Sequence, residues 1–239
     1  MRLLVSVRDA EEARVAWQHG AEIVDAKEPA AGALGAVPRA VLREIRAALP
    51  PAVPVSAALG DVAALEEVGP ALAGLPAGLA FVKLGFPGVA PAARVERLLA
   101  EAVGRAGSRP DGPKVIAVAY ADWRETSGVA PEEYPALIAA AGAAGLLIDT
   151  ARKDGRALPD HLPPADLAAI GVLLRERGLL YALGGSLTAL DIPLVAAARA
   201  DILGVRGAVT AGGRTSAIDP ARVAAMAESL RAGLAPSLR

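Results

Sequence analysis

Short apolar runs alternate with longer stretches of mixed polarity along the whole chain, a pattern that predicts strands alternating with helices. The runs are rich in Val, Ile, Leu and Ala and lack the strict polar–apolar alternation of a half-exposed strand. Continuous apolar character is typical of parallel strands covered on both faces. The predicted strands are residues 3–7, 22–27, 53–59, 79–85, 114–120, 145–150, 179–183 and 201–205.

The stretches between these runs carry helix signals at their ends. Asp9 is placed to cap a first helix, Pro38 stands where a helix favours proline, and Gly178 follows the last turn of another. The predicted helices are residues 10–19, 38–49, 62–73, 91–106, 131–144, 166–177, 188–199 and 219–230, and the tail to Arg239 is expected to fray.

Eight strand–helix units in succession predict an α/β fold, the (β/α)₈ or TIM barrel. An open doubly wound sheet is the alternative. No shift in composition marks a linker, so residues 1–239 are expected to form a single domain.

Composition narrows the function classes. Hydrophobic residues make up 54% of the chain and aromatic residues 3%, which suits alanine-rich helices packed on aliphatic strands. The net charge of −1 gives no basic surface for nucleic acid or membrane binding, and the chain has no cysteine for disulfides or thiolate chemistry. The apolar run at the start of the chain is too short for the hydrophobic region of a signal peptide, and no apolar run could span a bilayer. A cytoplasmic protein without a metal site is expected.

Lysine is rare in this chain. Of 25 basic residues only Lys27, Lys83, Lys114 and Lys153 are lysine. Where arginine is so strongly favoured, a retained lysine indicates chemistry that arginine cannot perform, such as nucleophilic attack by a neutral amine. Lys114 begins its strand and is interpreted as structural.

The other lysines gather with two carboxylates at the predicted mouth of the barrel. Asp25 and Lys27 lie two apart on one strand, Lys83 is near the end of another, and Asp149 ends a third with Lys153 just beyond it. Active sites of such barrels lie at these strand ends. The alternatives are a buried Asp25–Lys27 ion pair, a lysine that reaches solvent at position 83, a loop cap at 149 and a solvated charge at 153.

Crowded, partly desolvated ammonium groups lower one another's pKa. A lysine that is neutral near physiological pH can attack a carbonyl and form a Schiff base, while a second one moves protons. This constellation predicts a catalytic amine.

A second cluster follows the last two predicted strands, where barrels often bind phosphate. Glycine lets backbone N–H groups approach an anion, and a serine hydroxyl adds a donor. Ordinary turn glycines are the alternative. The predicted phosphate-binding residues are Gly184, Gly185, Ser186, Arg206, Gly207 and Ala208.

Taken together, these motifs resemble the (5-formylfuran-3-yl)methyl phosphate synthase family, also called 4-(hydroxymethyl)-2-furancarboxaldehyde-phosphate synthase. The resemblance covers nearly the whole chain, and residues 209–215 are where it is weakest. The motifs that carry it are VDAKEP at 24–29, GALG at 32–35, VSAALGD at 55–61, FVKLG at 81–85, AYAD at 119–122, LIDTARKDG at 147–155, LGGS at 183–186 and GVRGA at 204–208.

The resemblance implies a lyase that condenses two molecules of glyceraldehyde 3-phosphate in the biosynthesis of methanofuran-type C1 carriers, without metal or organic cofactor. It assigns the Schiff base to Lys27 and proton transfer to Lys83, with Asp25, Asp149 and Lys153 in support. Two other interpretations remain: a class I aldolase for another sugar phosphate, and a non-catalytic sensor of a phosphorylated ligand. The expected partner is this small molecule, with a homo-oligomer possible.

Overall fold

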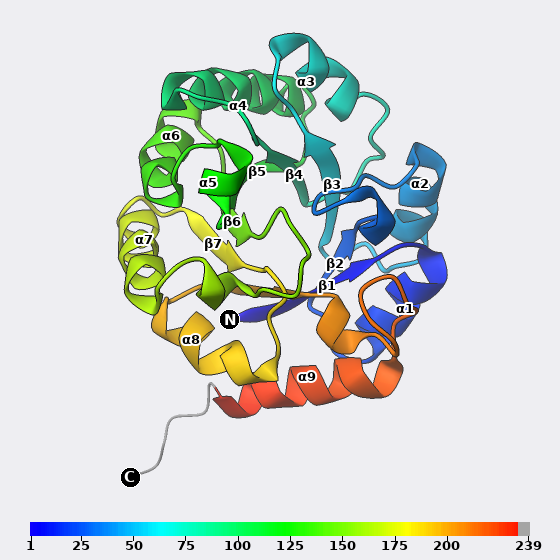
Figure 1. Cartoon of the computed structure of the whole chain (residues 1–239). Helices are drawn as coiled ribbons and strands as arrows, with labels where there is room; N and C mark the ends of the chain where they lie inside the picture. The colour runs from blue at the N-terminus through cyan, green and yellow to red at the C-terminus, as the bar shows by residue number, and fades with distance from the viewer. Residues whose placement is uncertain (234–239) are drawn as a thin grey trace.

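Eight parallel strands close into a barrel in the order β1 to β8 in the computed structural model, which describes residues 1–233 (Figure 1). β1 pairs with both β2 and β8, so the sheet has no free edge. Each strand lies within two residues of its predicted bounds, which confirms the TIM barrel. The strands are β1 (Arg2–Val7), β2 (Ile23–Ala26), β3 (Val55–Asp61), β4 (Phe81–Gly85), β5 (Lys114–Tyr120), β6 (Gly145–Asp149), β7 (Leu180–Leu183) and β8 (Ile202–Val205).

The helices form an outer ring, in which the last helix, α9, lies between α8 and α1 and ends beside α8 (Figure 1). Asp9 caps α1 by accepting from the N–H groups of Glu11 and Glu12, as predicted. The helices are α1 (Ala10–Gln18), α2 (Arg39–Ala47), α3 (Leu65–Leu72), α4 (Ala92–Gly107), α5 (Trp123–Thr126), α6 (Tyr134–Ala141), α7 (Pro164–Glu176), α8 (Ile192–Ala197) and α9 (Pro220–Gly233).

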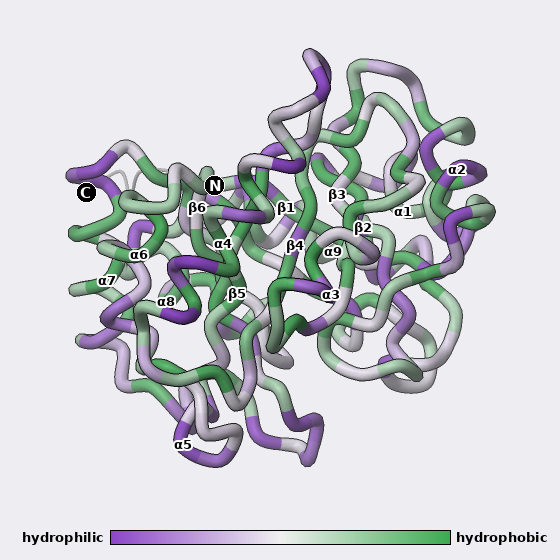
Figure 2. The backbone as a smooth tube through the Cα atoms, turned by 90° about the horizontal axis from the view of Figure 1, so that it is seen from above, coloured by the Kyte–Doolittle hydropathy of each residue, from purple (hydrophilic) through white to green (hydrophobic). Residues whose placement is uncertain are grey.

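Apolar side chains fill two separate layers. One core lies between the strands and the helix ring and includes Leu3, Val24 and Val82. A smaller core fills the barrel interior and includes Ile23 and Val118. Figure 2 shows hydrophobic chain running through the strands and hydrophilic segments in the outer helices and loops. Successive residues of a strand point to opposite faces. Ile23 points into the barrel and Val24 points toward the helices, so Asp25 points into the barrel.

The structure differs from the prediction mainly at helix starts. The helix predicted from residue 62 begins at Leu65, because β3 continues to Asp61 and Val62 donates to the carbonyl of Gly85. Short 3₁₀ turns at Pro131–Glu133 and Ala189–Asp191 form the first turns of two predicted helices. The predicted fraying falls largely on residues 234–239, which lie outside the described residues. Within residues 1–233, no helix is both long and apolar enough to cross a membrane.

Candidate active site

A cavity of about 420 Å³ opens at the carboxyl ends of the strands. Its wall includes Lys27, Lys83, Asp149 and Lys153, which come from three different parts of the chain. Lys114, by contrast, is exposed at the first residue of β5, at the opposite end of the barrel, as predicted. The structure therefore brings the predicted catalytic lysines together and leaves the predicted structural one apart.

Lys27 follows directly after β2 and continues its hydrogen bonding, since its N–H donates to the carbonyl of Val7 at 2.9 Å. Its side chain is buried, and Nζ lies 3.8 Å from Asp149 Oδ2. The other oxygen of Asp149 accepts from Lys153 Nζ at 2.7 Å. One carboxylate thus stands between two amines, held closely by one and more loosely by the other.

Asp25 pairs with Lys83, not with Lys27 on its own strand. Lys83 Nζ donates to Asp25 Oδ2 at 2.6 Å, and the hydroxyl of Ser6 donates to the same oxygen at 2.9 Å. Lys83 reaches this oxygen from β4, through the barrel interior. The sequence alternative of an Asp25–Lys27 ion pair is therefore replaced by two pairs, Asp25–Lys83 and Asp149–Lys27.

Burial is the main reason that the pKa of Lys27 falls, to about 8. The charge of Asp149 opposes the fall, whereas the neighbouring ammonium of Lys83 adds to it. A lysine with this pKa carries a substantial neutral fraction near pH 8, which is the form that attacks carbonyl carbon. The amine is therefore poised for nucleophilic chemistry.

Asp149 remains ionised in the same surroundings. Burial by itself would raise the pKa of this carboxyl, but the charges of Lys153 and Lys27 and the hydrogen bond from Lys153 lower it overall. A carboxylate that stays charged can hold the nearby amines and stabilise positive charge that develops on an imine.

Residues with free backbone N–H groups line the cavity after β7 and β8. In the part of the chain that the structure describes, no acceptor occupies the N–H groups of Gly185, Ser186, Gly207 and Ala208. Gly185 has φ +90°, a conformation that favours glycine, and Ser186 has φ +59°. Gly184 lies beside Asp149 and donates its own N–H to the carbonyl of Ile148, so it is not a free donor. We call the four free N–H groups the amide cradle.

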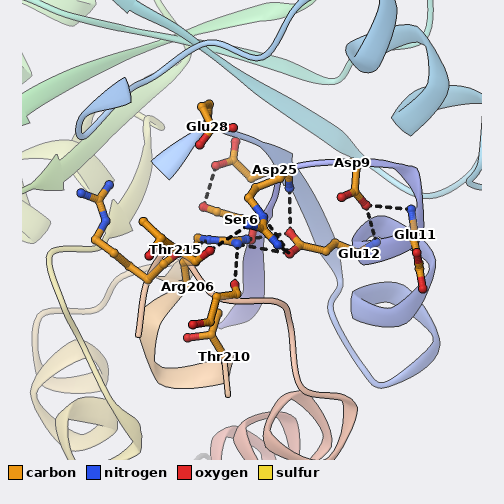
Figure 3. A network of polar contacts seen from close by, with 12 residues as sticks. Ser6, Asp9, Glu11, Glu12, Asp25, Glu28, Arg206, Thr210 and Thr215 are labelled. Atoms are coloured by element: carbon orange, nitrogen blue, oxygen red, sulfur yellow. Dashed lines mark hydrogen bonds and ion pairs between the residues drawn. The ribbon is translucent and has the colours of Figure 1, made fainter. Parts of the chain in front are cut away.

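Arg206 differs from its predicted role. Its guanidinium makes five hydrogen bonds within the protein, to Glu12 and to the carbonyls of Ser6, Arg214 and Ser216. Figure 3 shows it between Glu12 and the segment that carries Thr210 and Thr215. With its five donors used in this way, the guanidinium of Arg206 holds the loop after β8 and keeps no free N–H group for a phosphate.

A family model described as 4-HFC-P synthase matches residues 3–227. The chain belongs to the 4-HFC-P synthase family. It is 35% identical to the (5-formylfuran-3-yl)methyl phosphate synthase of Archaeoglobus fulgidus over 96% of this chain and 99% of that protein. It is also 35% identical to the protein of the same name from Methanosarcina mazei, over 91% and 94%. Membership makes the chain an enzyme.

Solved structures similar to this 4-HFC-P synthase family member are barrel enzymes. Phosphoribosyl anthranilate isomerase from Thermus thermophilus superposes with a TM-score of 0.65 at 22% identity, covering 97% of this chain and 99% of that one. A 3-hexulose-6-phosphate synthase superposes with a TM-score of 0.61 at 20% identity, covering 98% and 100%. At these identities the likeness supports the fold alone.

The structure of this 4-HFC-P synthase family member adds polar groups that the sequence interpretation missed or left unassigned. Ser6 and Ser56 line the cavity from β1 and β3, and their inward position follows from their register with Asp25. Asp122 accepts from the N–H groups of Ala151 and Arg152, and so fixes the loop that carries Lys153. Strand parity could have identified both serines, whereas the contacts of Asp122 depend on loop geometry.

Removing the charge of Asp149 or of Lys153, the two neighbours of Lys27 in this family member, should shift the pKa of Lys27 in opposite directions. Asp149→Asn removes a charge that raises the pKa of Lys27, so the pH at which imine formation is half-maximal should fall by about one unit. Lys153→Met removes a charge that lowers this pKa, so that pH should rise. Rapid-quench trapping of the imine with borohydride, from pH 6 to about 10.5 where free lysine titrates, measures both. Shifts in the same direction would contradict the assignment.

Proposed function

We propose that the protein is a (5-formylfuran-3-yl)methyl phosphate synthase, which condenses two molecules of glyceraldehyde 3-phosphate on a pathway to methanofuran-type C1 carriers. The observation that carries this proposal is the buried amine of Lys27, with its pKa lowered to about 8, beside an ionised Asp149. The names of the relatives state the product for those proteins. The amide cradle suits a substrate that bears phosphate.

Lys27 attacks the aldehyde carbon of the first triose phosphate, and loss of water gives the imine. The imine withdraws electrons from the neighbouring carbon and makes its hydrogen acidic, so that removing this proton produces an enamine. The enamine carbon is the nucleophile that joins the second triose phosphate. The imine itself is the electron sink, and the proposed chemistry needs no metal or organic cofactor.

Lys83 and Asp25 form the proton-transfer pair in this proposal. Their ion pair is buried. Lys83 and the neighbouring Ser56 line the cavity, so substrate in the cavity can contact this pair. Asp25 Oδ1 and the hydroxyl oxygen of Ser56 are buried, and no group among the described residues hydrogen-bonds to them. Buried polar atoms without partners are costly, so a substrate hydroxyl that donated to Asp25 Oδ1 or bonded to Ser56 would be bound favourably.

The overall reaction balances with the loss of one phosphate and two waters for each furan phosphate formed. Closing the ring returns the Lys27 amine, because an oxygen of the second triose replaces nitrogen at the former aldehyde carbon. In this proposal Lys153 gives a proton to an oxygen that leaves as water; it lines the cavity and donates to Asp149 and to the hydroxyl of Thr150.

The product separates this proposal from its alternatives. Purified protein incubated with glyceraldehyde 3-phosphate should produce an ultraviolet absorbance typical of a conjugated furan aldehyde, with one inorganic phosphate released per furan. A class I aldolase would form the imine on Lys27 and give a sugar phosphate without this chromophore. A sensor of phosphorylated ligands would bind the compound with no imine and no turnover.

A further inference from the structure

We infer that Arg214 binds the phosphate of the second triose phosphate, the one that does not form the imine on Lys27. This inference rests on the proposed function and adds a specificity-determining residue to it. Arg214 lies in the loop between β8 and α9, is half-buried, and lines the cavity. The geometry of the loop, the balance of charge and the position of the guanidinium support it independently.

Three side chains hold the loop that presents Arg214. Arg206 donates to the carbonyls of Arg214 and Ser216 at 2.6 and 3.0 Å, Arg8 to that of Thr215 at 2.8 Å, and Thr210 to that of Gly213 at 2.7 Å. Glu12 in turn holds Arg206 (Figure 3). It also pairs with Arg8. The backbone around Arg214 is thus held by hydrogen bonds from three side chains, which is the support that a pre-organised binding residue requires.

Charge distinguishes Arg214 from the other cations of the cavity wall. Lys27 and Lys153 share Asp149, Lys83 pairs with Asp25, and Arg206 pairs with Glu12. Within residues 1–233, no carboxylate lies within ion-pair distance of Arg214, which donates one hydrogen bond, to the carbonyl of Gly32 at 2.9 Å. Its remaining N–H donors can bind an incoming dianion without first breaking an ion pair.

The side chain of Arg214 starts beside Gly207, at the β8 end of the amide cradle, and extends toward the loop after β2. The Cβ of Arg214 is 4.0 Å from the position that a Cβ would take on Gly207, whereas its Nη2 reaches the loop after β2 at Gly32. The β7 end of the cradle lies beside Asp149, since a Cβ on Gly184, which precedes Gly185 and Ser186, would be 3.5 Å from Asp149 Cγ. A triose whose aldehyde carbon is on Lys27 can therefore extend past Asp149 to Gly185 and Ser186. Arg214, which reaches toward the loop after β2, is then left to the second molecule.

The test compares two concentration dependences in Arg214→Gln and wild-type protein. Trapping with borohydride reports binding of the first triose phosphate, and furan formation reports binding of the second. The glyceraldehyde 3-phosphate concentration that gives half-maximal imine trapping should be the same in the variant and in wild type. The concentration that gives half-maximal furan formation should rise about 10- to 100-fold in the variant. Arg214→Lys keeps the charge without the planar fork of the guanidinium. Its half-saturation concentration for furan formation should lie between those of wild type and Arg214→Gln. Arg222→Gln, at an exposed arginine of α9, is the control and should match wild type.

Two results would overturn the inference. Unchanged half-saturation for furan formation would remove Arg214 from substrate binding, and an equal rise in both measurements would assign it to the first phosphate. A wild-type protein that makes neither imine nor furan would instead refute the proposed function, so the two failures can be told apart. Unchanged thermal unfolding of Arg214→Gln excludes a purely structural effect.

Discussion

Lys27→Arg is expected to abolish imine formation and to lower the rate of furan synthesis by about 10⁴-fold or more. Guanidinium stays protonated at every accessible pH and is a poor nucleophile, so the positive charge survives while the reactive amine is lost. The measurement is furan absorbance over time under saturating glyceraldehyde 3-phosphate, with borohydride trapping in parallel.

Two further variants keep this prediction falsifiable. Lys27→Met removes the amine with a smaller side chain, in case arginine does not fit in the buried site, and should be equally inactive. Lys114→Arg is the matched control, because Lys114 is exposed at the other end of the barrel. Its activity should equal that of the wild type. A trapped adduct in either Lys27 variant would show that another amine carries the reaction.

Lys83→Met should separate imine formation from the steps that follow it. The variant retains Lys27 and should still be trapped with borohydride, but loss of the proton-transferring amine should lower furan synthesis by about 10²- to 10⁴-fold. Because the charge of Lys83 lowers the pKa of Lys27, its removal raises that pKa, and the comparison belongs at a pH well above 8. Loss of trapping at such a pH would assign Lys83 to imine formation itself.

The same substitution should destabilise the protein. Asp25 is fully buried, and removing its cation leaves an uncompensated charge, at a cost of about 3–5 kcal/mol. Lys83→Met/Asp25→Asn removes both charges, so it should unfold closer to the wild type in urea and remain slow in furan synthesis. Recovery of activity together with stability in the double variant would make the pair structural.

Strand periodicity accounts for what the sequence predicts well. The apolar runs determine eight parallel strands, and the parity of Ile23, Asp25 and Lys27 directs the last two into the barrel. The rule that barrel sites lie at the carboxyl ends of strands then groups Lys27 with Lys83 and Asp149. Each of these steps depends on local sequence and on barrel geometry, not on details of packing.

Pairing between distant residues could not be predicted in this way. Asp25 is two residues from Lys27, yet its partner is Lys83, 58 positions away. Arg206 follows β8 where a phosphate ligand is expected, but Glu12, 194 positions away, takes its guanidinium. Which carboxylate meets which cation depends on how the strands tilt and on which loops fold back, and neither is encoded by spacing.

The most direct test of the account is the site of the covalent adduct. Wild-type protein treated with glyceraldehyde 3-phosphate and borohydride, then digested and analysed by mass spectrometry, should carry one modification on the peptide that contains Lys27. The mass added should equal that of the triose phosphate less one oxygen atom, as reduction of an imine requires. An adduct on Lys83 or Lys153 with Lys27 unmodified, or active protein that yields no adduct, would contradict the account.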